Sequence, residues 1–351
     1  MIKISVCGHF GFNKNLVNGQ TIKTKIVTDE LKSFFGSDAI SYIDTCGGLK
    51  SIISITFQLI NKLFTSSAIV VFPSYKGLQF IIPVLTFMNK FIKKPIHYVV
   101  IGGWLPSFLS NKKFLTKMLK NLDGIYVETK CMKQELEKNG FKNVLVMPNC
   151  KPLRIVEKEV LTKKRNHKIK LCTFSRVMKE KGIEDAIEAT ILANNELNQN
   201  VFELDIYGQV EKNQEVWFKS LISEVPNYIS YKGIVDYSNT INTLKQYDML
   251  LFPTFYKGEG FAGTLIDAMA AGLPVIATDW KYNSDIVLEN QIGLLTPIND
   301  VKELKNNIIK LYNNEEEWFQ YRENSITNSQ KYLPKNAVSI LINNILQTDS
   351  Q

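Results

Sequence analysis

Residues 259–279 read EGFAGTLIDAMAAGLPVIATD, in which a glycine-rich turn leads into a helix pattern and then into an apolar strand pattern. Glycine in the turn lets the backbone approach a bound group closely. The first amide groups of a helix have no partner within the helix, so a helix N-terminus binds anions. The stretch therefore predicts a phosphate site that needs no metal ion, in a fold that alternates helices with strands.

Two carboxylates accompany this anion site. Glu259 precedes the helix, and Asp267 lies about one turn inside it, so that its side chain can point back towards the turn. Carboxylates suit the hydroxyl groups of a sugar or a ribose. Taken singly, Glu259 reads as a first-turn residue favoured by the helix dipole and Asp267 as a solvated helix position. Their joint placement favours binding of a nucleotide-sugar.

Cations are found upstream, after an expected strand at residues 169–174. Arg176 and Lys181 follow this strand and precede a helix pattern. In an open α/β sheet, ligands bind at the carboxyl ends of the strands. Both residues suit a diphosphate, whereas Lys179 reads as a solvated neighbour.

The whole chain repeats this alternation of strand and helix. Its 351 residues exceed a comfortable single core, so two α/β domains are expected. Strands are predicted at residues 2–7, 68–72, 96–101, 124–127, 169–174, 202–207, 249–252 and 275–277. Helices are predicted at residues 20–35, 51–64, 78–92, 112–121, 132–139, 183–194, 238–246, 263–271, 301–312 and 335–346.

Residues 148–167 break this rhythm with two prolines and several charges, and we interpret them as an interdomain linker. The expected domains are 1–160, joined by a C-terminal helix at 334–351, and 161–333. The helix at residues 335–346 has no strand after it, so we expect it to pack back on the first domain. The predicted fold class is α/β, with two doubly wound, Rossmann-like domains.

The net charge is distributed unevenly. Residues 1–165 hold 25 Lys/Arg and 10 Asp/Glu, a net charge of +15, whereas residues 166–351 hold 17 and 24, a net charge of −7. The basic half suits an anionic membrane or a nucleic acid, or is a solvated lysine-rich surface. Apolar residues around 78–92 and 104–109 suit a bilayer, although core packing explains many of them equally well. The lysines interspersed with them are Lys90, Lys93, Lys94, Lys112 and Lys113.

Five cysteines occur singly and the chain has only three histidines, so the sequence predicts no metal cluster. Scattered cysteines suit a reducing compartment, where they serve as small buried apolar groups. No signal peptide or membrane span is legible, and the expected location is the cytoplasm.

Glu259-x7-Asp267, followed by Ala-Met-Ala-Ala-Gly-Leu-Pro at residues 268–274, resembles the donor-site signature of glycosyltransferase family 4. This family has the GT-B fold, in which two domains face each other across a cleft, and it transfers sugars from nucleotide-sugar donors with retention. Further matches to the family are Phe174-Ser175-Arg176 with Lys181-Gly182, Met147-Pro148-Asn149, Asn18-Gly19-Gln20 and Ile101-Gly102-Gly103-Trp104.

The resemblance implies a role for each matching residue. Arg176 and Lys181 would stabilise the leaving diphosphate, and Glu259 would contact hydroxyl groups of the donor sugar. Asp267 would hold the ribose, and Gly19 would let a loop close on the phosphates. The remaining donor-binding positions would be Gly260, Phe261, Ala262, Gly263 and Thr264. The acceptor cleft would be lined by Gly102, Gly103 and Trp104.

Two positions depart from the family pattern. The second acidic residue is usually Glu, but here it is Asp267, whose shorter side chain predicts a longer or water-mediated ribose contact. Many members carry a histidine at the end of the fourth strand, where this chain has Gly102 and Gly103. His97 lies near the start of that strand, so we assign it no catalytic role.

These observations predict a metal-independent, retaining glycosyltransferase without a cofactor, since no Asp-x-Asp motif is present. The expected donor is a UDP- or GDP-sugar, and the expected acceptor is a saccharide, lipid-linked, in cell-surface polysaccharide biosynthesis. The alternatives are a GT-B epimerase or phosphorylase and an inactive, basic membrane- or nucleic-acid-binding protein. Arg176, Lys181 and Glu259 argue against lost chemistry, and nucleic acid is not an expected partner. A dinucleotide-dependent oxidoreductase is disfavoured, since no Gly-x-Gly-x-x-Gly follows the first strand.

Overall fold

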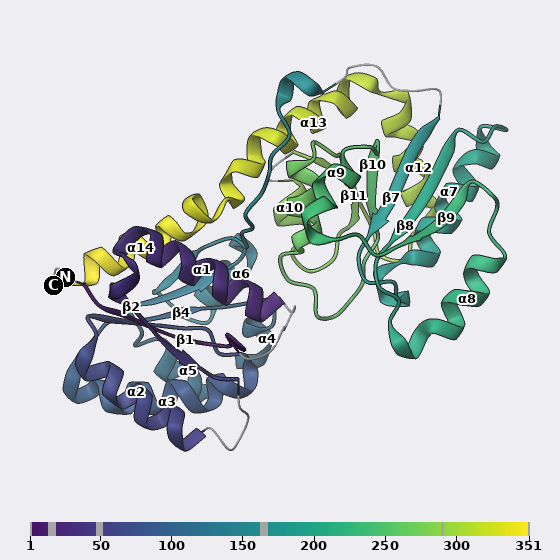
Figure 1. Cartoon of the computed structure of the whole chain (residues 1–351). Coiled ribbons are helices and arrows are strands. Elements are labelled where there is room, and N and C mark those ends of the chain that lie inside the picture. The colour runs from purple at the N-terminus through teal and green to yellow at the C-terminus, as the bar shows by residue number, and fades with distance from the viewer. Residues whose placement is uncertain (1, 13–18, 47–51, 162–167, 289–290, 350–351) are drawn as a thin grey trace. The chain divides into compact units, whose positions relative to one another are not determined.

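The computed structural model describes residues 2–12, 19–46, 52–161, 168–288 and 291–349. The chain divides into two compact units (Figure 1). The first unit is formed by Met1–Pro152 with Tyr332–Gln351, and the second by Leu153–Lys331. Each unit is built on its own parallel sheet of six strands.

The sheet of the first unit has the strand order β2-β1-β3-β4-β5-β6. Its strands are β1 (Ile4–Gly8), β2 (Ile40–Asp44), β3 (Ala68–Val71), β4 (Ile96–Val99), β5 (Gly124–Val127) and β6 (Val144–Val146). Every residue of β1, β3, β4 and β5 is buried, as expected for central strands of a parallel sheet with helices on both faces.

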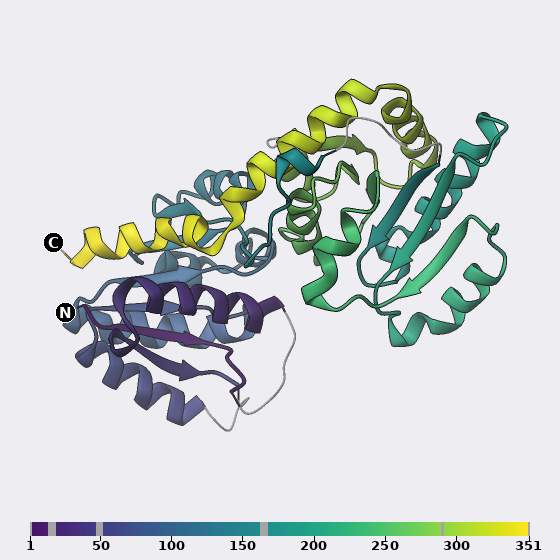
Figure 2. The same cartoon turned by 45° about the horizontal axis from the view of Figure 1, so that its top comes forward.

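Helices cover both faces of this sheet (Figure 2). They are α1 (Gly19–Phe35), α2 (Ile52–Thr65), α3 (Tyr75–Ile92), α4 (Leu105–Leu109), α5 (Lys113–Leu119), α6 (Lys130–Lys138) and α14 (Pro334–Asp349). Helix α14 packs along α1, although it comes from the other end of the chain. Its Leu341 and Ile345 are fully buried in the same apolar cluster as Val27 and Leu31 of α1.

The sheet of the second unit has the strand order β12-β11-β10-β7-β8-β9. Its strands are β7 (Ile169–Phe174), β8 (Phe202–Tyr207), β9 (Ile229–Gly233), β10 (Met249–Phe252), β11 (Val275–Thr278) and β12 (Gly293–Thr296). The helices of the unit are α7 (Ile183–Glu196), α8 (Glu215–Ser223), α9 (Thr240–Leu244), α10 (Gly263–Ala270), α11 (Asn283–Val287), α12 (Val301–Asn313) and α13 (Glu315–Ser329).

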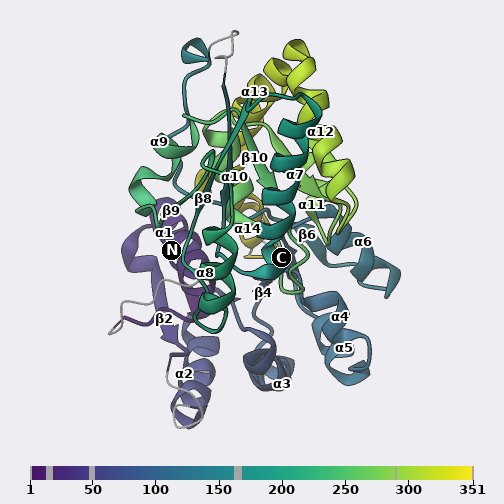
Figure 3. The ribbon, with the colours of Figure 1, turned by 90° about the vertical axis from the view of Figure 1, so that its right-hand side faces the viewer.

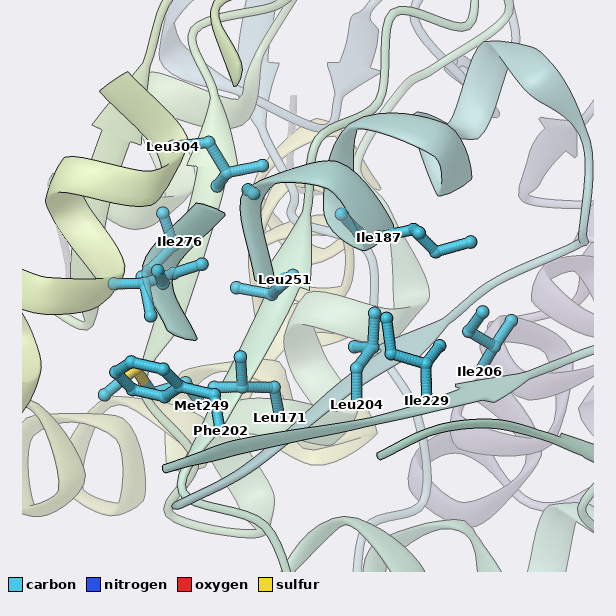
Figure 4. Packing of buried hydrophobic residues seen from close by; sticks show 14 of the residues in the cluster. Leu171, Ile187, Phe202, Leu204, Ile206, Ile229, Met249, Leu251, Ile276 and Leu304 are labelled. Carbon is cyan, nitrogen blue, oxygen red and sulfur yellow. The ribbon is translucent and has the colours of Figure 1, made fainter. Parts of the chain in front are cut away.

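The core of the second unit lies between its sheet and the helices α7 and α12 (Figure 4). Leu171, Leu251 and Ile276 come from three neighbouring strands and meet Ile187 of α7 and Leu304 of α12. All five side chains are buried. Such a core fixes the strand ends, and so it holds the turns that follow β7 and β10 in place.

The predicted fold class is confirmed: each unit is a doubly wound α/β layer structure. The prediction missed the strands β2, β6, β9 and β12, which are the four edges of the two sheets. Each of them is only partly buried, so none shows the continuous apolar run that marks a central strand. Helices α4, α8, α11 and α13 were also missed, and the predicted helix at 238–246 is a 3-10 turn, Tyr237–Asn239, followed by the short α9.

Candidate active site

The second unit has one point in its sheet where the chain connections diverge. Strands β7 and β10 are neighbours, but β7 continues through α7 to β8 on one side, and β10 continues through α10 to β11 on the other. In open α/β sheets, ligands bind beyond the carboxyl ends of the strands at such a switch point. Arg176 follows β7 and Thr254 follows β10, so both lie at this position.

A buried ion pair occupies the switch point. The ammonium Nζ of Lys181 lies 2.5 Å from Oε2 of Glu259, and both side chains are only 9% exposed. The hydroxyl of Thr254 donates to the same carboxylate oxygen at 2.8 Å. Glu259 is therefore neither solvated nor held by the helix dipole alone, and two of the three residues predicted as catalytic, Lys181 and Glu259, are in direct contact.

Gly182 explains how Lys181 reaches this position. The glycine has φ +70° and follows the short 3-10 turn Lys179–Lys181. A Cβ atom on Gly182 would lie 2.1 Å from the carbonyl oxygen of Pro253, which follows β10. Only glycine combines this backbone conformation with so close an approach, so the residue lets the turn after β7 pack against the end of β10.

Arg176 belongs to the same cluster, because it and Lys181 both contact the ring of one tyrosine. The guanidinium of Arg176 lies 5.3 Å from the ring centre of Tyr256, and Nζ of Lys181 lies 5.1 Å from the same ring. The side chain of Arg176 is half exposed, and its Nη1 pairs with Glu211 at 3.0 Å. Both predicted cations therefore contact the ring of one tyrosine, and Arg176 is the more exposed of the two.

Sequence reasoning missed Tyr256, although a signal was present. The tyrosine lies in the short segment between β10 and the glycine-rich turn, and its carbonyl accepts a hydrogen bond from Nε1 of Trp280 at 2.8 Å. A Cβ atom on Gly258 would lie 2.7 Å from the Tyr256 ring. The close approach of Gly258 to this ring requires a residue without a side chain, and the glycine is visible in the sequence.

The glycine-rich turn enters α10 as predicted. Phe261 and Ala262 are buried, and α10 begins at Gly263. The hydroxyl of Thr264 donates to the carbonyl oxygen of Phe174 at 2.8 Å, which fixes the helix N-terminus beside the end of β7. Asp267 is buried within α10, so it does not occupy the solvated position that its spacing also allowed.

The first unit holds the remaining predicted residues. Gly19 is the first residue of α1, and a Cβ atom there would meet nothing within 4 Å. Gly102 has φ +84°, and its amide donates to Oε2 of Glu128 at 3.2 Å. The other oxygen of Glu128 forms a buried ion pair with Lys23 at 2.6 Å. The turn after β4 is therefore anchored to α1 and β5.

The predicted acceptor residue Trp104 lies in an aromatic cluster. Its ring lies edge-on to Phe108, with ring centres 5.2 Å apart, and 6.3 Å from the ring of the exposed Tyr75. Its Nε1 donates to the carbonyl of Ile101 at 2.8 Å, which fixes the ring plane. Of these three rings, that of Tyr75 is exposed, whereas those of Trp104 and Phe108 are half-buried.

A pocket of about 300 Å³ lies at the switch point of the first sheet, where β1 and β3 are neighbours. His9 and Ser74, which follow these strands, contribute to its wall, and Ile55 of α2 and Phe80 of α3 line it with apolar surface. Nδ1 of His9 lies 2.9 Å from the hydroxyl of Thr21. The sequence prediction did not include this pocket, because its lining comes from five separate segments of the chain.

The buried thiols and His97 have no sign of reactivity. Burial raises the pKa of Cys7 to about 12 and that of Cys150 to about 11. Burial lowers the pKa of His97 to about 4, and its Nδ1 lies 3.0 Å from the hydroxyl of Tyr126. Across the described residues, His, Cys, Asp and Glu side chains form no group of three or more that could hold a metal ion.

Comparison with known proteins identifies the family. A model described as Glycosyl transferases group 1 matches residues 157–332, half of the chain, and the chain belongs to this family. It is 30% identical over 172 residues to the uncharacterized glycosyltransferase MJ1069 of Methanocaldococcus jannaschii. The aligned residues make up 49% of this chain and 43% of that protein.

A second relative is the GtfA subunit of the UDP-N-acetylglucosamine–peptide N-acetylglucosaminyltransferase of Streptococcus pneumoniae. It is 35% identical over 130 residues, which cover 36% of this chain and 24% of that protein. The chain thus spans less than half the length of either relative.

Solved structures identify the fold as GT-B. Anabaena HepE, crystallised with UDP, superposes with a TM-score of 0.72 at 13% identity, covering 99% of this chain and all of that one. Sucrose-phosphate synthase from Thermosynechococcus elongatus superposes with a TM-score of 0.68 at 14% identity, covering 99% and 98% of the two chains. In the described part of this chain, no helix is long and apolar enough to cross a membrane.

Proposed function

We propose that this glycosyltransferase is a retaining, metal-independent enzyme of family 4 that moves a sugar from a UDP- or GDP-sugar to a saccharide acceptor. The observation that carries the proposal is the cluster of Arg176, Tyr256, Lys181 and Glu259 at the switch point of the second sheet. It combines two cations with a carboxylate at the place where such a sheet binds ligands.

The cations of the cluster suit the leaving diphosphate. Negative charge grows on a phosphate oxygen as the bond to the anomeric carbon breaks, and fixed cations stabilise that charge most in the transition state. Arg176 is half exposed and reaches solvent, while Lys181 is buried beside Glu259. In the bound state, Lys181 would contact the diphosphate and Glu259 the hydroxyl groups of the sugar.

The turn before α10 supplies the second part of the donor site. We propose that backbone amides at the start of α10 bind the phosphate and sugar, as helix N-termini bind anions. The positions concerned are Gly260, Phe261, Ala262, Gly263 and Thr264. The hydroxyl hydrogen of Thr264 is used by Phe174, so the amide rather than the hydroxyl would donate to the donor. Asp267 would hold the ribose, and Gly19 of the first unit would approach the phosphates.

Retention would follow from front-side attack. The bond between the anomeric carbon and the phosphate oxygen breaks, and its electron pair goes to that oxygen. The acceptor hydroxyl bonds to the anomeric carbon from the same face, and its proton passes to the leaving phosphate. This sequence needs no nucleophile from the protein and no cofactor, and the cations would supply the charge stabilisation that a divalent metal supplies elsewhere.

The acceptor would bind to the first unit. The pocket beside β1 and β3 offers polar groups at the strand ends and an apolar wall from α2 and α3. Gly102, Gly103 and Trp104 would line the adjoining acceptor surface. A lipid-linked saccharide combines polar and apolar parts in the same way. Two relatives are named as a poly(ribitol-phosphate) N-acetylglucosaminyltransferase and a phosphatidyl-myo-inositol mannosyltransferase, which supports a polymer or lipid acceptor.

Such an acceptor would place the enzyme in the cytoplasm at the inner face of the membrane, in cell-surface polysaccharide synthesis. The net charge of +15 on residues 1–165, counted from 25 Lys/Arg and 10 Asp/Glu, supports this location.

The decisive experiment is a thermal-shift screen of nucleotide-sugars followed by product analysis with and without acceptor. Stabilisation by one UDP- or GDP-sugar, and transfer of its sugar with retained anomeric configuration, is the expected result. Conversion of the donor to an isomer without any acceptor would identify an epimerase instead. An inverted product would contradict the front-side mechanism.

A further inference from the structure

The stretch between Asp44 and Asp123 has an extreme charge pattern. Residues 45–122 contain ten lysines and no aspartate or glutamate. This stretch supplies the helices α2, α3, α4 and α5 of the first unit. Charge on these helices is therefore of one sign, and no carboxylate of the same elements neutralises it.

Three of these helices form a continuous layer. Helix α2 packs against α3, and α3 packs against α5 (Figure 3). Each helix buries one side: Leu59 and Leu63 of α2, Leu85 of α3, and Leu115 and Leu119 of α5 lie inside the unit. The opposite sides of the same helices are left exposed.

These exposed sides carry large aromatic rings. The phenylalanine side chains there are 56 to 79% exposed, although phenylalanine is among the residues most often buried. They are Phe57 and Phe64 of α2, Phe87 and Phe91 of α3, and Phe114 of α5. Phe87 and Phe91 are one helical turn apart with ring centres 6.4 Å from each other, so they project from the same side of α3.

Lysines lie beside these rings. Nζ of Lys90 lies 5.9 Å from the ring centre of Phe87. Lys113 and Lys117 flank Phe114 along α5, and Lys93 ends α3. Within the described residues, none of these four lysines forms an ion pair. We call the exposed phenylalanines and lysines of α2, α3 and α5 the basic aromatic face.

We propose that the basic aromatic face docks on an anionic phospholipid bilayer, with its phenylalanine rings inserted at the boundary of headgroups and acyl chains. Lysines meet the headgroup phosphates, while the rings leave water for the acyl region. A nucleic acid would match the lysines but would leave five rings in water. The inference deepens the proposed function, on which it rests for its biological context, by assigning the membrane contact to named residues.

The same helices wall the pocket of the first unit. Ile55 of α2 and Phe80 of α3 line it, while Phe57 and Phe87 of these helices face outwards. A bilayer bound to the basic aromatic face would therefore lie against the helices that form the apolar wall of this pocket. The arrangement would bring the enzyme to the surface where a lipid-linked acceptor resides.

Vesicle co-sedimentation of the full chain tests the proposal without donor or acceptor, so its result is independent of transferase activity. Vesicles of phosphatidylglycerol with phosphatidylcholine are compared with vesicles of phosphatidylcholine alone. We expect binding only to the anionic vesicles, and strong weakening when salt rises from about 0.05 M to about 0.5 M, because salt screens exposed charges.

A charge variant identifies the face. Each lysine near an anionic surface changes binding by about fivefold, so replacing four should weaken it by about 100-fold or more. The variant carries Lys90→Gln, Lys93→Gln, Lys113→Gln and Lys117→Gln, all at exposed positions. The matched control loses the same charge from the second unit through Lys212→Gln, Lys219→Gln, Lys245→Gln and Lys302→Gln, also exposed. The control should bind nearly as well as the unaltered chain.

An aromatic variant tests insertion. Phe57→Ala, Phe91→Ala and Phe114→Ala together should weaken binding by about 100-fold or more, because each ring that leaves water contributes roughly a factor of ten. The matched control carries Val216→Ala, Ile234→Ala and Leu288→Ala, three exposed apolar residues of the second unit. Thermal melting checks that all variants fold, which exposed positions should permit.

Four outcomes would overturn the proposal. The first is equal binding to neutral and anionic vesicles. The second is an equal loss in the charge variant and its control. The third is unchanged binding of the aromatic variant, and the fourth is tighter binding to a short RNA duplex than to vesicles. Either of these two would reduce the surface to a general polyanion site.

Discussion

Lys181 and Glu259 are 78 positions apart in the sequence, yet their charged groups form a buried ion pair with Nζ 2.5 Å from Oε2. The pair joins the turn after β7 to the turn before α10. Removing one partner of a buried ion pair leaves the other charge uncompensated in a region of low polarity. A substitution of either residue is therefore expected to affect stability as well as the proposed catalysis, so the two effects must be measured separately.

Replacing Lys181 tests the pair. Lys181→Ala should lower the free energy of unfolding by about 3–5 kcal/mol, because Glu259 stays buried without its partner. It should also lower turnover by about 100-fold, as does the loss of one preorganised group that stabilises transition-state charge. Urea denaturation and the rate of nucleotide release from the preferred donor measure the two effects. Lys181→Ala combined with Glu259→Ala should recover stability but not turnover; recovery of both would remove Lys181 from the mechanism.

Replacing Arg176 separates catalysis from stability. Its side chain is half exposed, so Arg176→Ala should leave the free energy of unfolding nearly unchanged. Turnover should nevertheless fall by about 100-fold. Lys179→Ala is the matched control, since it removes an exposed cation three residues away. Equal rates in both variants would show that the diphosphate binds elsewhere.

Tyr256 should contribute through its ring. Both predicted cations lie over it, at 5.3 and 5.1 Å from the ring centre. Tyr256→Leu should weaken nucleoside diphosphate binding by about 3- to 30-fold, the range expected when a cation–π contact is lost. Tyr256→Phe keeps the ring and should bind nearly as well as the unaltered chain. Calorimetric titration with UDP or GDP measures both, and a strong loss in Tyr256→Phe would assign the role to the hydroxyl group.

Turnover should not depend on a divalent metal. The proposal assigns charge stabilisation to Arg176, Lys181 and the N-terminus of α10, so chelation removes nothing that the reaction needs. The rate of sugar transfer is measured before and after dialysis against EDTA, with Mg²⁺ and Mn²⁺ added back. Loss of activity on chelation, and its return with either metal, would refute metal independence.

His97 should make stability depend on pH. Burial lowers its pKa from 6.5 to about 4, so the folded chain keeps the imidazole neutral where the unfolded chain takes up a proton. The neutral imidazole therefore contributes to the stability of the fold above the pKa that His97 has in the unfolded chain. This contribution is lost as pH falls towards the pKa that His97 has in the folded chain. The loss between about pH 7 and about pH 5 should be about 2 kcal/mol.

Chemical denaturation across this range, compared between the unaltered chain and His97→Gln, measures the contribution of His97. Between about pH 7 and about pH 5, the free energy of unfolding should fall by about 2 kcal/mol less in the variant than in the unaltered chain. Identical slopes would show that His97 has the same pKa in the folded and the unfolded chain.

The local sequence was sufficient to predict the central strands and most helices. Buried strands such as β5 and β10 are short runs of apolar residues, and the helix α10 follows directly from its glycine-rich turn. The edge strands β2, β6, β9 and β12 escaped prediction. An edge strand is set by pairing with its one neighbour and by partial burial, and neither leaves a continuous apolar run in the sequence.

The residue types at the site could also be predicted from the sequence. Arg176, Lys181 and Glu259 stand in patterns whose chemistry suits a diphosphate and a sugar. How these residues assemble could not be predicted from the sequence, because contacts between the turns after β7 and β10 depend on strand order. Tyr256 becomes part of the site only because the two cations converge on it in space.

The sequence by itself determined the fold class, the glycine-rich turn and the unequal charge of the two halves, since these depend on local pattern and composition. Only the tertiary structure decided that Lys181 pairs with Glu259, that a pocket opens beside β1 and β3, and that the phenylalanines of α2, α3 and α5 share one exposed layer. The physical reason is that each of these features joins segments distant in the chain. Which segments meet is fixed by sheet order and core packing, and no local pattern records it.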